Sequence, residues 1–260
     1  MPRPRKSFDT AGVKSATRVL ALLELFDRLE RPASVTEIAR EMGIPQSSTS
    51  MLVNSLIDRG YLTALPDRRV QPTPRVSMLG RWVDERITDG RVTRLMRDLG
   101  EETGETILLG IASDVHVLYI AVIPATRAMR LHIPAGTRRP IADSGMGLML
   151  LSAMTDTEID RRVARAAQAR EPGAAPLVPE DIMAEIAAIR ARGHALSASR
   201  IVPGAGIVCT LLPTSEGSQP MSVGIGGQAF EVVEREKVFA DLLARKIARH
   251  FAGDRGPEAI

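Results

Sequence analysis

Residues 34–75 read SVTEIAREMGIPQSSTSMLVNSLIDRGYLTALPDRRVQPTPR, and this stretch decides the fold of the N-terminal part of the chain. Apolar residues recur at helical spacing behind Ser34, a favourable N-cap, and Gly43 follows them, so we predict a short amphipathic helix over Val35–Met42. Pro45 then restarts the chain as a second helix. That helix turns its apolar residues inward, namely Leu52, Val53 and Leu56. Two short helices joined by such a turn are typical of a helix-turn-helix motif, whose second helix enters the major groove of DNA.

A β-hairpin is predicted directly after the motif. Gly60 is a candidate C-cap, and the strand Tyr61–Leu65 follows it. A turn over Pro66–Arg69 leads into the second strand, Val70–Pro72. Arg68 lies beside Arg69 at the tip of this hairpin, where both side chains are placed to contact the phosphate backbone. The hairpin is therefore the wing of a winged helix-turn-helix.

A first helix is predicted ahead of the motif, over Val13–Phe26. Its apolar residues fall on one stripe and include Val19, Leu22, Leu23 and Phe26. This helix completes a DNA-binding domain over residues 13–75. Residues 1–12 show no periodicity, and their basic residues are Arg3, Arg5 and Lys6. We interpret them as a flexible basic arm, which either contacts DNA or is only a solvated tail.

The charge of the chain is concentrated in this N-terminal part. The first 76 residues hold 12 Lys and Arg against 8 Asp and Glu, whereas the rest of the chain holds 22 against 23. A chain of 260 residues with 44% apolar residues is large enough for two modest domains. No signal peptide and no apolar run of membrane-spanning length is visible, so we expect a cytoplasmic protein. The single cysteine, Cys209, excludes a disulfide within the chain.

A linker helix is predicted between the two domains, within residues 76–90. Helical spacing continues over Val76–Ile87, and the only tryptophan, Trp82, lies beside the apolar stripe. A short isolated amphipathic helix has little of its own to pack against, so we expect it to pair with a second subunit. The alternative is that it packs on its own domain.

Residues 91–253 are predicted to form an α+β domain, followed by a tail over 254–260. Its expected helices cover Val92–Gly104, Gly145–Met154, Thr155–Ala169, Pro179–Arg192 and Glu231–Phe251. Its expected strands cover Thr106–Ala112, His116–Ile123, Met129–Pro134, Ala195–Val202, Gly206–Pro213 and Met221–Gly227, with Ser113-Asp114 as a hairpin turn. Together they form an antiparallel sheet of about six strands with helices around it.

The search for catalytic chemistry finds no nucleophile elbow, phosphate loop or zinc-binding helix. The histidines have no metal-ligand spacing and are His116, His132, His194 and His250. The Gly224–Gly227 segment is better explained by close backbone approach in a strand than by phosphate binding. We therefore expect no catalytic residue, no metal and no cofactor.

The start of the predicted Gly145–Met154 helix is the candidate ligand site. Ser144 precedes two glycines there, and glycines leave room beside backbone N–H groups. Because a helix N-terminus favours negative charge, a small carboxylate could be held at this place. Tight packing of the helix on the sheet explains the same glycines equally well.

Several motifs of the chain resemble the IclR-type family of transcriptional regulators. In the N-terminal half they are Lys14-Ser15 with Arg18 and Leu20, Gln46-Ser47-Ser48-Thr49, Asp58-Arg59-Gly60-Tyr61-Leu62, and Thr73-Pro74-Arg75-Val76 with Leu79-Gly80. In the second half they are Leu99–Gly104 with Thr106, Asp143–Leu151, Arg192-Gly193-His194-Ala195, and Pro203-Gly204 before the Cys209 strand. The first set matches in order and spacing, the second more loosely, and together they cover almost the whole chain.

The resemblance implies a winged helix-turn-helix domain, a linker helix and a GAF-like effector-binding domain. It also implies dimers or dimers of dimers on a palindromic double-stranded DNA operator, and a pocket between the sheet and the helix that starts near Gly145. The DNA-contacting residues that we expect on these grounds are Lys14, Thr36, Gln46, Ser47, Ser48, Ser50, Met51, Asn54, Arg68 and Arg69.

The chain departs from the family pattern at both sites. Met51 and Asn54 stand where the recognition helix usually carries arginines, and Gly224 and Gly226 stand where relatives often place carboxylate-binding serines. Leu148 stands where a lysine is usual, and Ser197–Arg200 replaces a typically acidic stretch. We therefore expect an altered, more apolar pocket that suits an aromatic or bulky acid. The expected effector-site residues are Met129, Leu131, Ser144, Gly145, Met146, Cys209, Gly224 and Gly226.

The leading hypothesis is thus a ligand-responsive DNA-binding regulator that forms a homo-oligomer. One alternative is an enzyme or metabolite-binding protein whose winged domain serves protein contacts; its pocket would have to draw on Asp143, His132 and Cys209. Another is a regulator whose second domain has lost its ligand and serves only oligomerisation.

Overall fold

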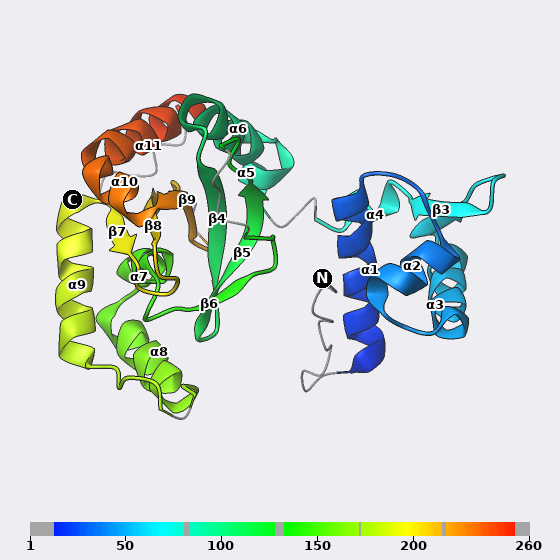
Figure 1. The fold of residues 1–260 in the computed structure, drawn as a ribbon, viewed down its shortest axis with the longest axis horizontal. Helices are drawn as coiled ribbons and strands as arrows, with labels where there is room; N and C mark the ends of the chain where they lie inside the picture. Colours follow the sequence, from blue (N-terminus) through cyan, green and yellow to red (C-terminus); the bar gives the residue numbers. More distant parts are fainter. Residues whose placement is uncertain (1–12, 81–83, 128–132, 172, 215–216, 253–260) are drawn as a thin grey trace. The chain divides into compact units, whose positions relative to one another are not determined.

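The structure is a computed structural model that describes residues 13–80, 84–127, 133–171, 173–214 and 217–252. The chain divides into two compact units, one ending at Glu85 and the other beginning at Arg86. Figure 1 shows a small helical unit and a larger unit built around a curved sheet.

The N-terminal unit is a three-helix domain with a small sheet. Its helices are α1 (Lys14–Leu29), α2 (Val35–Met42) and α3 (Gln46–Asp58). Its strands are β1 (Ala33–Ser34), β2 (Leu62–Ala64) and β3 (Arg69–Pro72), in the antiparallel order β1-β3-β2. The core side chains come from all three helices and from the sheet, and include Leu22, Leu25, Ile38, Val53, Leu62 and Val70. The predicted winged helix-turn-helix architecture is confirmed.

The capping residues explain why both ends of the first helix of the motif, α2, were predicted correctly. The Oγ of Ser34 accepts a hydrogen bond from the backbone N–H of Glu37 at 3.2 Å. At the other end Gly43 adopts a φ of +67°, a left-handed conformation that glycine takes without steric cost. The short strand β1, by contrast, was not predicted, because a two-residue strand shows no alternation.

The single linker helix predicted over Val76–Ile87 is wrong. The described residues form two short helices instead, α4 (Arg75–Met78) and α5 (Glu85–Thr88), and Leu79 and Gly80 form a turn after α4. Trp82 lies outside the described residues. Leu79 is 53% exposed and Ile87 is 41% exposed, so these two residues of the predicted apolar stripe are not buried, and helices this short are marginal without packing.

The helix α5 is tied to the C-terminal unit by one buried arginine. The guanidinium of Arg86 donates to the backbone carbonyl of Pro213 and, at 3.2 Å, to that of Gln219. Only 2% of Arg86 is exposed. Hydrogen bonds from a buried charge are needed to offset its desolvation, and these two fasten the entry of the chain to the second unit.

The C-terminal unit contains a six-stranded antiparallel sheet. Its strands are β4 (Thr106–Ser113), β5 (His116–Ile123), β6 (Arg138–Pro140), β7 (Ala195–Ala198), β8 (Ala205–Leu211) and β9 (Met221–Gln228), in the order β6-β5-β4-β9-β8-β7. Five of these six strands were predicted, and the predicted α+β class is confirmed. The strand β6 was not predicted, and residues 129–132 of the strand predicted over Met129–Pro134 lie outside the described part.

Helices cover both faces of this sheet (Figure 1). One face packs on α6 (Arg91–Thr103), α10 (Ala229–Glu234) and α11 (Glu236–His250). The other packs on α7 (Gly145–Ser152), which is joined by α8 (Asp156–Gln168) and α9 (Pro179–Arg192). Side chains alternate between the two cores along β4, where Ile107 and Leu109 face the first core and Leu108 faces the second. The face that carries α7 is called the α7 face below.

Three smaller predictions need correction. The predicted last helix is broken at Arg235 into α10 and α11. The hairpin between β4 and β5 turns at Asp114-Val115, one residue later than expected, because Ser113 pairs with His116 and Asp114 takes a φ of +54°. The strand predicted over Ala195–Val202 ends at Ala198, since the chain turns at Ser199, which has a φ of +55°.

Candidate DNA-binding surface and effector cavity

The exposed face of α3 carries most of the predicted base-reading residues. Gln46, Ser50 and Asn54 follow one another at a spacing of four residues, which places them on one side of the helix. Ser47 and Met51 lie beside them, whereas Thr49, Val53 and Leu56 are buried on the opposite side. Met51 is 73% exposed, so its side chain is accessible to an apolar group such as a thymine methyl.

Two side chains of this face are held by hydrogen bonds. The amide nitrogen of Gln46 donates to the Oγ1 of Thr36 on α2 at 3.2 Å, so the two helices of the motif are joined at the exposed surface. The hydroxyl of Ser50 donates to the backbone carbonyl of Gln46 at 2.9 Å, so its oxygen can still accept a hydrogen bond. Ser48 is half-buried and Asn54 is exposed.

The wing presents two arginines of different electrostatic character. Arg69 forms an ion pair with Asp67 at 2.6 Å, and this arginine holds the pKa of the Asp67 carboxyl below its usual range through hydrogen bonds. Arg68 sits at the tip in a left-handed conformation with a φ of +64°, and no residue of the described chain forms an ion pair with it. Arg68 is therefore the more available cation for a phosphate.

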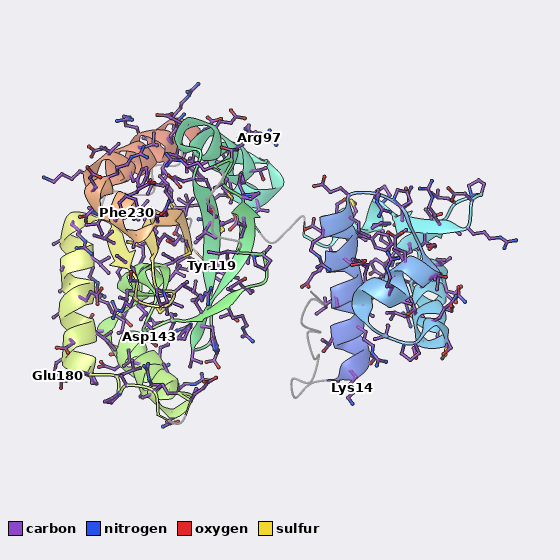
Figure 2. The ribbon with its side chains drawn as sticks, viewed as in Figure 1. Lys14, Arg97, Tyr119, Asp143, Glu180 and Phe230 are labelled. Carbon is purple, nitrogen blue, oxygen red and sulfur yellow. The ribbon has the colours of Figure 1, made fainter. Side chains whose placement is uncertain are left out.

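Lys14 begins α1 and is exposed (Figure 2). The predicted arm, with Arg3, Arg5 and Lys6, lies outside the described residues. Of the residues predicted to contact DNA, the structure gathers Gln46, Ser50 and Asn54 on one face of α3 and joins Gln46 to Thr36 of α2, while Arg68 and Arg69 lie on the wing.

A cavity of about 60 Å³ opens on the α7 face of the sheet in the C-terminal unit. It lies where the start of α7 meets the strands, with apolar walls that include Leu108, Ile133, Val202 and Ile207. The polar side chains that line it are Tyr119, Arg139, Ser144, Ser197 and Arg200. No acidic residue of the described chain lines this cavity, so its polar lining is positively charged.

Three of the predicted effector-site residues line the cavity, namely Ser144, Gly145 and Gly226. The Oγ of Ser144 caps α7 by accepting from the backbone N–H of Gly147 at 3.0 Å. A Cβ added to Gly226 would meet nothing closer than 3.4 Å, so this glycine leaves real space in the cavity floor. Gly145 is different, because a Cβ there would lie 2.6 Å from the Cβ of Ser197; its small size serves packing of the helix on the sheet.

The remaining described candidates, Met146, Cys209 and Gly224, do not line this cavity. Met146 is fully buried against Gly110, and Gly224 lies under the side chains of Ile207 and Cys209. Cys209 is itself fully buried, and burial raises the pKa of its thiol to about 12. These residues belong to the packed core because Ile207 fills the space above Gly224. Met129 and Leu131 lie outside the described residues.

The two arginines and the tyrosine of the cavity were missed by the sequence reasoning. Tyr119 was placed on a predicted strand, and the inward-facing alternation of that strand would have found it. Arg139 lies on the three-residue strand β6, whose sequence Arg138-Arg139-Pro140 gives no strand signal by itself. Only its pairing with β5 decides which arginine faces inward.

No trio of histidine, cysteine or acidic side chains in the described part of the chain is arranged to hold a metal ion. Of the residues that an enzymatic pocket would need, Asp143 is paired with Arg170 at 2.8 Å and His132 lies outside the described residues. None of the helices that the structure describes is long and apolar enough to cross a membrane.

Two family models match the chain, and together they span nearly all of it. The model of the IclR helix-turn-helix domain matches residues 15–66, and the model described as bacterial transcriptional regulator IclR C-terminal matches residues 89–250. Among curated proteins, the chain is similar to the transcriptional repressor IclR of Escherichia coli, with 26% identity over 71% of this chain and 69% of the relative. It is also similar to the regulator BhcR of Paracoccus denitrificans, with 27% identity over 84% of this chain and 79% of the relative.

Solved structures show the same fold. An IclR homologue from Microbacterium hydrocarbonoxydans, solved in complex with 4-hydroxybenzoate, covers 92% of this chain and 99% of its own, with a TM-score of 0.63 and 19% identity. The IclR structure from Thermotoga maritima covers 91% of this chain and 97% of its own, with a TM-score of 0.62 and 19% identity.

Proposed function

The chain belongs to the IclR family of bacterial transcriptional regulators, and from this premise we propose that it binds a palindromic operator as a homo-oligomer and responds to a small organic acid. Its N-terminal helix-turn-helix is the DNA-binding domain, its C-terminal domain is the effector-binding domain, and it is a regulator and not an enzyme. We place the protein in the cytoplasm, where its DNA is. The domain boundaries that we propose are residues 13–75, 76–90 and 91–253.

The single observation that carries the DNA-binding proposal is the exposed row on α3. Gln46, Ser47, Ser50 and Asn54 point away from the core on the helix that this motif inserts into the major groove. Amide side chains such as Asn54 contact adenine bidentately, which is worth about 1 to 3 kcal/mol of discrimination. Lys14, Arg68 and Arg69 supply phosphate contacts, which position the domain without reading sequence.

The effector proposal rests on the cavity at the start of α7. A cavity with apolar walls and a few cationic or hydroxyl groups suits a small acid with an apolar body. The ligand acts only if it binds two arrangements of the oligomer with different affinity. The exposed apolar side chains near the linker, Leu79 among them, support a subunit contact there.

The proposed DNA contacts of the wing are tested with Arg68→Ala and Arg69→Ala, separately and together, in full-length protein. Binding to DNA from the gene's own upstream region is measured by fluorescence anisotropy at several salt concentrations. Removing one phosphate contact lowers the salt slope by about one and weakens binding to all sequences alike. We expect the larger loss for Arg68→Ala, because Arg69 is already paired with Asp67.

The matched control is Arg245→Ala, which removes an exposed arginine from α11 in the other unit. It should leave affinity and salt slope unchanged. An unaltered salt slope in the Arg68→Ala, Arg69→Ala double variant would refute the assignment of the wing.

A further inference from the structure

The cavity holds one cation that lacks a protein counter-ion. Two arginines line it, and Arg200 is neutralised by both carboxylate oxygens of Glu185, at 2.7 and 2.8 Å. Arg139 has no such partner in the part of the chain that the structure describes, and it is half-buried. A partly buried guanidinium without a counter-ion favours an anionic ligand.

Strand register places Arg139 beside a buried tyrosine. Arg139 pairs with Val117 across β6 and β5, and side chains two residues apart on a strand share a face. Arg139 and Tyr119 therefore both lie on the α7 face of the sheet. Figure 2 labels Tyr119 within the C-terminal unit, where it is only 6% exposed.

The hydroxyl of Tyr119 forms no hydrogen bond with the described residues and is not among their fully buried unpaired polar atoms, so it is accessible from the cavity. Burial raises the pKa of Tyr119 to about 12, and the nearby Arg139 opposes this rise only in part. The phenol thus keeps its proton at neutral pH and acts as a hydrogen-bond donor toward the cavity.

The part of the cavity beside Gly226 carries no unpaired cation among the described residues. Its floor strand β9 has glycines at positions 224 and 226, which supply no hydroxyl. The space above Gly224 is filled by Ile207, whose Cδ1 would lie 2.7 Å from a Cβ at that position. Ser197, which pairs with Ile207, borders this part with a neutral hydroxyl, and Leu108 and Ile207 give it apolar walls.

We propose that Arg139 and Tyr119 form the carboxylate-binding end of the effector cavity, and that the apolar body of the acid lies over Gly226 between Leu108 and Ile207. This assignment rests on the proposed function, and it names the ligand class as a monocarboxylate with an apolar body. The start of α7 at Ser144 and Gly145 borders the same cavity and adds the positive end of a helix dipole.

The test is isothermal titration calorimetry of the full-length protein with propionate, benzoate and 4-hydroxybenzoate, each beside its uncharged amide. Arg139→Gln should weaken binding of the bound acid about tenfold or more, since a charge-assisted hydrogen bond is lost. Binding of the matching amide should change less than twofold. Tyr119→Phe should weaken the acid about threefold to tenfold, and Arg139→Lys should recover part of the lost affinity.

The chain itself provides a control variant. Arg138→Gln removes the neighbouring arginine, which pairs with Leu118 and therefore faces the other side of the sheet, near Ser113. It should change acid affinity less than threefold, and thermal unfolding checks that every variant is folded.

The outcomes separate the assignment from the proposed function. If Arg139→Gln binds the acid as tightly as the unaltered protein, the assignment of Arg139 and Tyr119 is overturned. The proposed function then stands, with the effector bound by other residues. An equal loss of acid and amide binding also overturns it, because the residue would then only shape the cavity. If the unaltered protein binds DNA but none of the acids, both the proposed effector class and the assignment fall.

Discussion

The structure fixes the direction of Gln46, one of the side chains that we propose to read bases. Its amide nitrogen donates one hydrogen to Thr36, which leaves its second N–H and its carbonyl oxygen for a base. An amide contacts adenine bidentately through one donor and one acceptor, and fixing the side chain beforehand reduces the entropy lost on binding. Thr36 is therefore a positioning residue for Gln46.

Replacing Thr36 by valine tests this role. Thr36→Val keeps the shape of the side chain and removes the acceptor, so affinity for the upstream DNA should fall about threefold to tenfold. Binding to bulk DNA should stay the same, because phosphate contacts are intact. Anisotropy titrations with both DNAs measure the difference. Thr157→Val, at the same second position of α8, is the control, and an equal loss on both DNAs would argue against positioning.

Cys209 should be chemically inert in the folded protein. Only the thiolate reacts with thiol reagents, and a pKa of about 12 leaves about one thiol in ten thousand ionised at pH 8. The native protein should therefore not react with 5,5′-dithiobis(2-nitrobenzoate), whereas one equivalent should react in guanidinium chloride, since the chain has one cysteine. Rapid labelling without denaturant would show that this strand is open to solvent.

Residue-level prediction succeeded where a residue acts through its neighbours in sequence. Ser34 and Gly43 were found because capping is local, and the hydrogen bond of Ser34 and the dihedral of Gly43 match. It was wrong for Gly224, whose surroundings are set by Ile207 and Cys209 on another strand. Arg139 was missed for the same reason, because its inward direction depends on pairing with β5.

At the level of elements, the helix α7 packs closely against the sheet and against the residues that lead into the helix. A Cβ at Gly147 would lie 2.0 Å from the carbonyl oxygen of Ile141 and 2.6 Å from the Oγ of Ser144. Backbone atoms cannot yield as side-chain ends do, so Gly147→Ala should destabilise the protein by about 1 to 3 kcal/mol. In a domain of this size that lowers the melting temperature by about 3 to 10 °C.

Gly226→Ala is the matched comparison, because its new Cβ would make only an ordinary contact with Leu108 at 3.4 Å. Its melting temperature should stay within about 2 °C of the parent, while acid binding should weaken because the added methyl group occupies the cavity floor. Calorimetric melting and ligand titration measure both effects. The opposite ranking of the two melting temperatures would contradict the packing described for α7.

Helices with a cap, proline or glycine at their ends were predicted with the correct bounds. Elements whose form depends on packing against other segments were not. The helices α2 and α9 match their predicted bounds, since a cap or a proline begins each and a glycine ends each. The linker failed because its apolar stripe predicts a helix that has nothing within its own unit to pack on. The last helix was predicted without its break at Arg235, whose guanidinium packs over the ring of Phe239 at 4.4 Å.

For the whole molecule, regulation requires that the effector cavity and the DNA-binding surface influence one another. They lie in separate units joined by the short helices α4 and α5, and Arg86 anchors the second of these to the C-terminal unit. A coupling of about 1 to 3 kcal/mol, which corresponds to a change in DNA affinity of about 5- to 150-fold, is usual for such regulators. The linker is the covalent route for it.

The proposed regulator is tested by fluorescence anisotropy of the full-length protein on DNA from its own upstream region, at two salt concentrations, with and without propionate, benzoate and 4-hydroxybenzoate. We expect tighter binding than to bulk DNA, a steep loss of affinity with salt, and a change of at least about fivefold with one of the acids. If the protein binds this DNA no more tightly than bulk DNA under every condition, α3 is not a recognition helix, and the proposed sequence-specific regulator is contradicted.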